Sequence, residues 1–148
     1  MAGGVAMEER KKALYFKEVD KEPFARLLNI RLKEVDEGYA LCEMEYTAQM
    51  DNIHRTAHGG ALFSLIDEAF EISSNSHEKI AVALNMNITY IKPPKKDTLL
   101  TAESKEVART KKTATYYIAV SDKEGLIAIC QALVYIKEKA IPFLKEMG

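Results

Sequence analysis

The sequence predicts one α+β domain in which a long antiparallel sheet wraps around a single apolar helix. Between Gly59 and Ile72, apolar residues recur every three and four positions, which is the period of an amphipathic helix. Two β-like runs precede this stretch and four follow it. The 148 residues fit one ordinary domain, and no repeat, low-complexity tract or flexible linker divides them.

Helical segments are expected before the sheet. An N-terminal extension should cover residues 1–22, because Met7 to Val19 has helical spacing. Pro23 suits the first turn of a short second helix. The domain itself is expected over residues 23–138, followed by a C-terminal tail over residues 139–148.

Six runs bounded by turn residues are expected to form the sheet. The first two alternate apolar and polar residues around Asp36-Glu37-Gly38, as the strands of a hairpin do. The last two are rich in Val, Ile, Tyr and Thr, which favour strands. The serine-rich cluster at 73–76 should end the helix, because its side chains compete for backbone hydrogen bonds. The six runs cover residues 30–37, 39–46, 80–91, 98–109, 113–121 and 126–136.

Charge and composition argue against several classes of protein. Lys and Arg total 21 against 22 for Asp and Glu, whereas nucleic-acid binders are normally strongly basic. Cys42 and Cys130 lie far apart and indicate a reducing compartment rather than a disulfide framework. The N-terminus lacks the apolar core of a signal peptide, and no apolar run reaches the roughly 20 residues of a membrane span. We expect a soluble, cytoplasmic protein with no nucleic-acid or membrane partner.

Asp67 is the candidate for a reactive carboxylate on the predicted helix. At 100° per residue it falls at the border of the apolar arc, beside Phe63 and Phe70. Neighbouring aromatic rings and the like charge of Glu71 should both raise its pKa, as a general base or nucleophile requires. A solvated acidic helix face is the alternative interpretation. The polar sector is expected to hold Ser64, Asp67, Glu68 and Glu71.

The predicted helix begins with His58-Gly59-Gly60. A glycine pair at a helix start leaves backbone N–H groups unobstructed at the positive end of the helix dipole, where an oxyanion can be stabilised. Close packing or a sharp entry turn would equally require glycine. No nucleotide-binding glycine loop and no Gly-x-Ser-x-Gly nucleophile motif occurs in the chain.

Two further features of the sequence bear on a metal site and on a phosphate site. His54 and His58 are four residues apart with Asp51 nearby, but the stretch is predicted as a loop, so no metal or other cofactor is expected. Basic residues cluster at two predicted turns and would hold phosphates only beside an active site. These residues are Arg109, Lys111 and Lys112 at one turn, and Lys92, Lys95 and Lys96 at the other.

Residues 52–75, NIHRTAHGGALFSLIDEAFEISSN, resemble the signature of hotdog-fold acyl-CoA thioesterases. The resemblance is greatest to the PaaI-like branch, from phenylacetate degradation, and to the related 4-hydroxybenzoyl-CoA thioesterases. It rests on an Asn, a His-Gly-Gly and an Asp at the ninth position after that His. It extends through NMNITYIKPPKKDTLLTAES and covers the chain from about Phe24 to Ile136. The family's fold, a six-stranded sheet around a central helix, matches the predicted order of elements.

The resemblance also implies roles for individual residues. Gly59 would offer its N–H to the thioester carbonyl, and His58 would orient the thioester. Asn52 would position water or the carboxylate, and Asp67 would be the nucleophile or general base. The residues expected to contact substrate are Gly60, Phe63, Glu68 and Asn85, with Arg109, Lys111 and Lys112 holding coenzyme A phosphates.

One departure from the family concerns the strand after the helix. Family members often carry a Ser or Thr there that assists catalysis, whereas this chain reads Ala81-Val82-Ala83-Leu84-Asn85, without a hydroxyl. Asn85 or Asn87 could take that place.

Helix geometry predicts that two subunits share each active site. Gly59 and Asp67 are eight residues apart, about 12 Å along a helix, whereas an attacking atom must lie within roughly 3.5 Å of its carbon. Two antiparallel helices related by a twofold axis can supply both groups. We therefore expect a homodimer, which could pair further into a homotetramer.

The sequence leaves three functions to compare. An acyl-CoA thioesterase, acting on aryl, phenylacetyl or other acyl groups, fits the motif best. A non-catalytic acyl-CoA-binding sensor or carrier is the first alternative, because of the missing hydroxyl. A hotdog hydratase is the second, although it would need a His close after its Asp, and His77 lies ten residues past Asp67.

Overall fold

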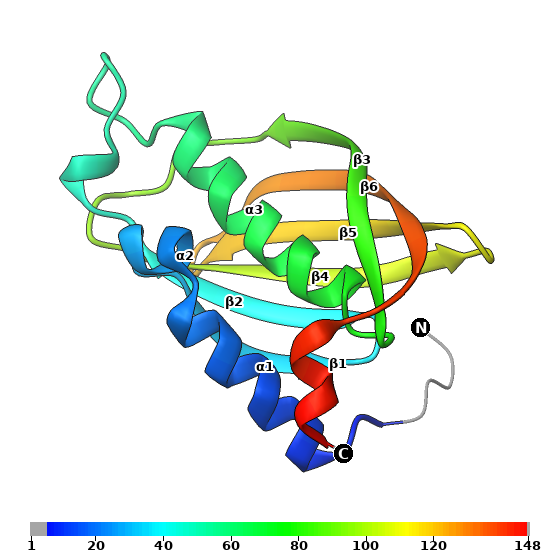
Figure 1. The fold of residues 1–148 in the computed structure, drawn as a ribbon. Helices are drawn as coiled ribbons and strands as arrows, with labels where there is room; N and C mark the ends of the chain where they lie inside the picture. The colour runs from blue at the N-terminus through cyan, green and yellow to red at the C-terminus, as the bar shows by residue number, and fades with distance from the viewer. Residues whose placement is uncertain (1–5, 148) are drawn as a thin grey trace.

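A computed structural model describes residues 6–147 and confirms the α+β architecture, with strands wrapped around one central helix (Figure 1). The helices are α1 (Glu9–Lys21), α2 (Pro23–Leu27), α3 (Gly59–Ser74) and the 3₁₀ turns η1 (Ala48–Met50) and η2 (Pro142–Met147). The strands are β1 (Arg31–Asp36), β2 (Tyr39–Glu45), β3 (Lys79–Tyr90), β4 (Leu99–Arg109), β5 (Thr113–Asp122) and β6 (Gly125–Ala140).

The strands form one six-stranded antiparallel sheet in the order β1-β2-β4-β5-β6-β3. The two strands before α3 form the predicted hairpin, with Asp36 opposite Tyr39. The chain then crosses to the far edge of the sheet as β3 and returns through the three remaining strands. Helix α3 therefore lies against the concave face between both edges (Figure 1).

The apolar side of α3 is the centre of the core. Leu65, Ile66, Ala69 and Phe70 are at most 1% exposed, and the Phe70 ring packs edge-on against Tyr116 at a centroid distance of 5.6 Å. Burial of an apolar side chain of this size contributes roughly 1.5–3 kcal/mol. The 3.6-residue pattern that predicts the helix is thus the pattern of its contacts with the sheet.

Helix α3 ends where the serine-rich cluster predicts. Asn75 follows the last helical residue, and its Nδ2 donates to the carbonyl of Glu71 at 2.9 Å. Its Oδ1 accepts from the N–H of Ala81 at 2.9 Å. One side chain therefore closes the helix and attaches the start of β3 to it.

The ends of the chain pack against each other. β6 continues four residues beyond the predicted run, and η2 follows it where a tail is expected. The Tyr15 ring of α1 meets the Phe143 ring of η2 edge-on at a centroid distance of 5.1 Å. The first five residues of the expected N-terminal extension lie outside the described part of the chain.

β3 is an edge strand with one unpaired side. It is 12 residues long and exposes large apolar side chains, among them Val82, Leu84 and Tyr90. A long apolar edge of this kind favours pairing with another strand.

Among the described helices, none combines the length and hydropathy that crossing a bilayer requires.

Candidate active site at the start of the central helix

His58 is the N-cap of α3, and its side chain determines which backbone donors remain available. His58 Nδ1 accepts a hydrogen bond from the N–H of Gly60 at 2.8 Å. The N–H groups of Ala61 and Leu62 donate to the His58 carbonyl at 2.9 and 3.4 Å. The first turn of α3 has four backbone N–H groups, and among residues 6–147 the N–H of Gly59 is the one of the four that has no acceptor.

This hydrogen bond also defines the state of the imidazole. Nδ1 must be unprotonated to accept from Gly60, so the proton of the neutral ring is on Nε2. Gly60 was expected to contact substrate, but its N–H is occupied by the cap. Among the described residues, the donors left without an acceptor here are therefore the Gly59 N–H and, in the neutral ring, the His58 Nε2–H.

The two glycines are each in close contact with a ring. A Cβ on Gly59 would lie 3.3 Å from the Tyr90 ring, and a Cβ on Gly60 would lie 3.0 Å from His58 Nδ1. The Tyr90 hydroxyl also donates to the Gly59 carbonyl at 3.2 Å. Both glycines are therefore closely packed, as one of the alternative explanations of the glycine pair expects. The N–H of Gly59 is nevertheless without an acceptor among the described residues.

Asn52 organises the loop that leads into α3. Its Oδ1 accepts from the N–H groups of His54 and Thr56 at 2.8 and 3.2 Å, and its Nδ2 donates to the Thr56 hydroxyl at 3.0 Å. Both halves of the amide are thus occupied within the loop. The structure places Asn52 just before the helix start, without bringing it to Asp67 of the same chain.

Asp51 anchors the same loop to the body of the domain. Its carboxylate accepts a short hydrogen bond from the Tyr46 hydroxyl and pairs with Lys96 at 2.9 Å. Among the described residues, His54, His58 and Asp51 do not form a group with metal-ligand spacing.

Asp67 lies two turns after Gly59, on the exposed side of α3. Partial burial of its carboxyl raises the pKa above the ordinary aspartate value, and the negative charge of Glu22 raises it further. The helical wheel places Asp67 beside Phe63 at the border of the apolar arc, and the Phe63 side chain is 39% exposed, as expected for that border. Within one chain, the eight-residue separation from Gly59 places the two groups about 12 Å apart.

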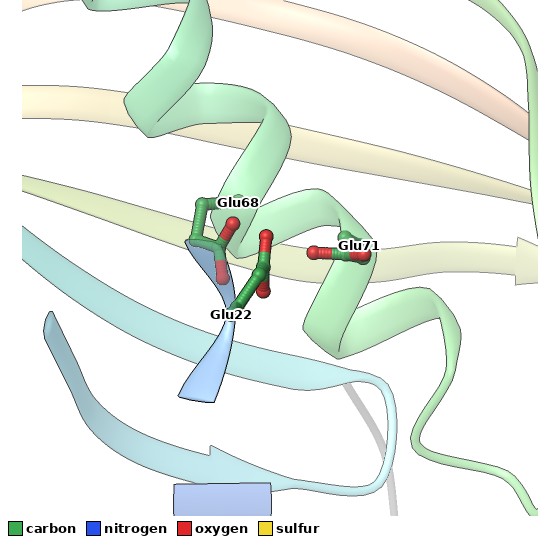
Figure 2. Close-up of side chains that lie close together, drawn as sticks. All are labelled: Glu22, Glu68 and Glu71. Atoms are coloured by element: carbon green, nitrogen blue, oxygen red, sulfur yellow. The ribbon is translucent and has the colours of Figure 1, made fainter. Parts of the chain in front are cut away.

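Glu68 is not on a solvated polar face, and that part of the prediction is wrong. Its side chain is 3% exposed, and a carboxylate oxygen of Glu22, at the junction of α1 and α2, lies within 4.8 Å of its own. Glu71 completes a group of three carboxylates (Figure 2). Burial is the main cause that raises the pKa of both Glu68 and Glu71 above ordinary glutamate values, and the neighbouring Glu22 carboxyl group adds to it for both.

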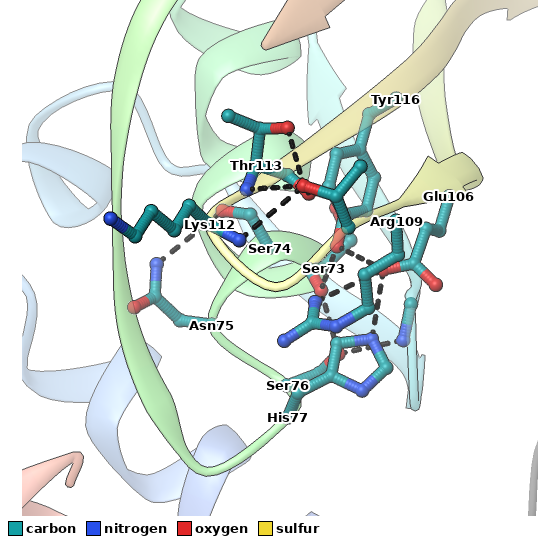
Figure 3. A network of polar contacts seen from close by, with 12 residues as sticks. Ser73, Ser74, Asn75, Ser76, His77, Glu106, Arg109, Lys112, Thr113 and Tyr116 are labelled. Atoms are coloured by element: carbon teal, nitrogen blue, oxygen red, sulfur yellow. Dashed lines mark hydrogen bonds and ion pairs between the residues drawn. The ribbon is translucent and has the colours of Figure 1, made fainter. Parts of the chain in front are cut away.

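The cluster of Arg109, Lys111 and Lys112 lies at the other end of the helix. Figure 3 shows Arg109 and Lys112 beside the residues that end α3, whose 16 residues span about 24 Å. Arg109 pairs with Glu106 at 3.2 Å, and Lys111 is exposed. The structure therefore does not bring this cluster to Gly59 of the same chain.

His77 belongs to the same polar network and not to the candidate site. Its Nε2 is 3.0 Å from Glu106 Oε1, which also accepts from the Tyr116 hydroxyl at 2.9 Å (Figure 3). The imidazole faces Glu106 rather than Asp67. This arrangement disfavours the hydratase alternative, in which a His would act together with the Asp.

The second basic cluster lies on the connection between β3 and β4, near the start of α3. Lys96 pairs with Asp51 in the loop before the helix, and Lys95 pairs with Glu124 at 2.9 Å. Lys92 is exposed at the end of β3 that carries Tyr90.

The remaining candidates divide between surface and core. Phe70 and Tyr116 are core residues, whereas Phe63 and Tyr90 are partly exposed and available to a ligand. Asn85 is exposed on β3, directly after a register irregularity of that strand.

An antiparallel sheet that wraps one central helix in this way is the hotdog fold. The chain belongs to the thioesterase superfamily, which its residues 54–129 match. The acyl-coenzyme A thioesterase PaaI of Escherichia coli is 36% identical over 71% of this chain and 75% of its own. A relative from Archaeoglobus fulgidus is 39% identical over 92% of this chain and 87% of its own. The solved structure of E. coli PaaI has a TM-score of 0.83 and 31% identity, covering 87% of this chain and 94% of that one.

Proposed function

We propose that the protein is an acyl-CoA thioesterase that hydrolyses an acyl-CoA to a carboxylic acid and free coenzyme A. The observation that carries the proposal is the unsatisfied N–H of Gly59, at the start of a helix whose other first-turn donors are occupied. A preorganised donor of this kind is what a developing thioester oxyanion requires. Membership of the thioesterase superfamily and the likeness to PaaI support the same reaction.

Each active site in this proposal takes its groups from two chains. The Gly59 N–H of one chain binds the thioester carbonyl, and Asp67 of the partner chain acts on the carbonyl carbon. The separation of about 12 Å within one α3 supports this division. The exposed apolar edge of β3 supplies the pairing surface, since strand pairing there would bring two copies of α3 side by side.

The proposed reaction follows from these positions. Asp67 either removes a proton from a water molecule that attacks the carbonyl carbon, or attacks it directly to form a mixed anhydride that water then hydrolyses. In both routes the C–S bond breaks and the coenzyme A thiolate takes up a proton. His58 donates through Nε2–H to the thioester, and Asn52 acts by shaping the loop that presents His58.

Substrate contacts complete the proposal. Phe63 and Tyr90 offer exposed aromatic surface to an acyl group such as an aryl or phenylacetyl group, and Asn85 offers an exposed amide farther along β3. Coenzyme A phosphates are held by Arg109, Lys111 and Lys112, which a dimer would bring from the other chain to the Gly59 end.

Thiol release from a panel of aryl and straight-chain acyl-CoAs tests the proposal. Wild type should release coenzyme A, and Asp67→Asn should abolish release while acyl-CoA binding persists. Asp20→Asn, an exposed position of α1, is the matched control and should behave as wild type. Absence of turnover on every substrate, or full turnover in Asp67→Asn, would contradict the proposed function.

A non-catalytic acyl-CoA-binding protein is the second candidate. The observation that favours it is the stretch from Ala81 to Asn85 on β3, which carries no hydroxyl. Saturable acyl-CoA binding without thiol release would identify this function in the same assay.

A further inference from the structure

Three carboxylates converge at α3, two of them on the helix itself and one from the junction of α1 and α2. One ligand oxygen each from Glu22, Glu68 and Glu71 lies within 4.8 Å of the others. Figure 2 shows the three carboxyl groups directed toward one another, from the α1–α2 junction and from two successive turns of α3. Oxygen atoms that surround one cation have separations in this range.

Glu68 supplies an independent observation that points to a ligand. The side chain is 3% exposed, and its Oε2 has no hydrogen-bond partner among the described residues. Buried carboxylate oxygens are normally hydrogen-bonded, paired or bound to a metal. A buried, unpartnered oxygen in a group of acids therefore needs a cation or a proton.

Basic side chains do not supply the missing charge. Lys21, next to Glu22 in sequence, pairs with Glu18 at 3.3 Å. Across residues 6–147, no ion pair within 4.0 Å joins a Lys or Arg to Glu22, Glu68 or Glu71.

We propose that Glu22, Glu68 and Glu71 bind a hard divalent cation, such as Mn²⁺, Ca²⁺ or Mg²⁺. Three carboxylates without nitrogen or sulfur ligands match the preference of these ions, and water completes the coordination. The cation ties the α1–α2 junction to the helix that carries Asp67. Because the ligand set includes neither Gly59 nor Asp67, the site does not depend on the proposed thioesterase reaction.

The cation also has an entry path. Glu22 and Glu71 line a cavity of about 540 Å³ between α1, α3, the start of β3 and η2. Glu18 lines the same cavity without belonging to the cluster, so it offers a matched control.

Binding of Mn²⁺ to chelator-treated full-length protein tests the proposal. Calorimetry should give one Mn²⁺ per chain, and the Tm should rise with Mn²⁺ or Ca²⁺ concentration but not with NaCl of equal ionic strength. Glu68→Gln and Glu71→Gln should each weaken Mn²⁺ binding by about tenfold or more, whereas Glu18→Gln should leave it unchanged. Glu71 is exposed, so Glu71→Gln carries the test if Glu68→Gln does not fold.

Three results would overturn the proposal. The first is no saturable Mn²⁺ binding up to about 1 mM, the weak end of protein calcium sites. The second is equal weakening by Glu71→Gln and Glu18→Gln. The third is a Glu68→Gln variant that is more stable than wild type while neither protein binds Mn²⁺, which would mean that the three acids share protons instead.

Discussion

His58 Nδ1 accepts a hydrogen bond from the N–H of Gly60 at 2.8 Å. The side chain of the helix cap thus occupies the Gly60 N–H, which is next to the open N–H of Gly59. Together with the two N–H groups that donate to the His58 carbonyl, this bond leaves the Gly59 N–H as the first-turn donor without a partner in residues 6–147. The start of α3 is thus arranged for one acceptor atom at one defined position.

Gly59→Pro should remove the proposed oxyanion donor and retain the fold. Gly59 is the first residue of α3, a position that suits proline, and His58 has the extended backbone that precedes proline, with φ −63° and ψ 132°. We expect thiol release to fall by roughly 10²–10³, as for the loss of one oxyanion-hole donor. Gly59→Ala is the control, since it adds the same Cβ beside Tyr90 but keeps the N–H. Equal activity in the two variants would contradict the assigned role.

Gly60→Ala should disturb the His58 cap. The new Cβ would lie 3.0 Å from His58 Nδ1, so the imidazole has to move and its hydrogen bond weakens. Loss of an N-cap costs about 1 kcal/mol of stability, and a displaced imidazole should also lower kcat. Urea unfolding and thiol release measure the two effects. Ser64→Ala, which removes a hydrogen bond to the Gly60 carbonyl but leaves His58 in place, should retain kcat.

His77 should make the protein less stable in mild acid. Burial and the positive charge of Arg109 lower its pKa, against the opposing effect of Glu106 and Glu37. The unfolded chain therefore binds the proton more readily, and stability is lost as the pH falls from about 6.5 through the lower folded-state pKa. Denaturant unfolding between about pH 7 and pH 5 should show a shallower loss for His77→Gln. Parallel curves for the two proteins would count against this explanation.

Leu84→Glu should separate the subunits of the proposed dimer. Leu84 is 57% exposed on β3, and a charge there opposes strand pairing at the open sheet edge. Sedimentation should show a smaller species, and thiol release should be lost with it. Val107→Glu on β4 is the matched control, since Val107 is 64% exposed but does not lie on the edge strand. A dimer that persists in Leu84→Glu would rule out β3 as the interface.

Local patterns predicted most of the fold. The apolar period of α3, the Asp36-Glu37-Gly38 turn and the serine-rich helix end all act between near neighbours, and each lies where the sequence indicates. The end of β6 was missed because its last residues are mostly exposed and lack an apolar pattern.

The candidate site was less predictable because distant segments define it. A helical wheel places Glu68 on the polar side, but its side chain is buried and lies beside Glu22, which comes from a segment far away in the sequence. The cap formed by His58 and the use of Asn52 within its own loop depend on side-chain rotamers, which spacing does not specify. A His directly before a predicted helix start was the signal for the cap.

Complementation between two inactive variants tests the shared active site most directly. A mixed dimer of one Gly59→Pro chain and one Asp67→Asn chain contains two sites if each site is formed across the subunits. One of these sites has both groups intact, and the other has both groups altered. Random assortment makes half of the dimers mixed, so co-refolded protein should recover about a quarter of wild-type thiol release. If Gly59 and Asp67 of one chain served the same site, every site would contain one altered group. No recovery from stably mixed dimers would therefore contradict the account.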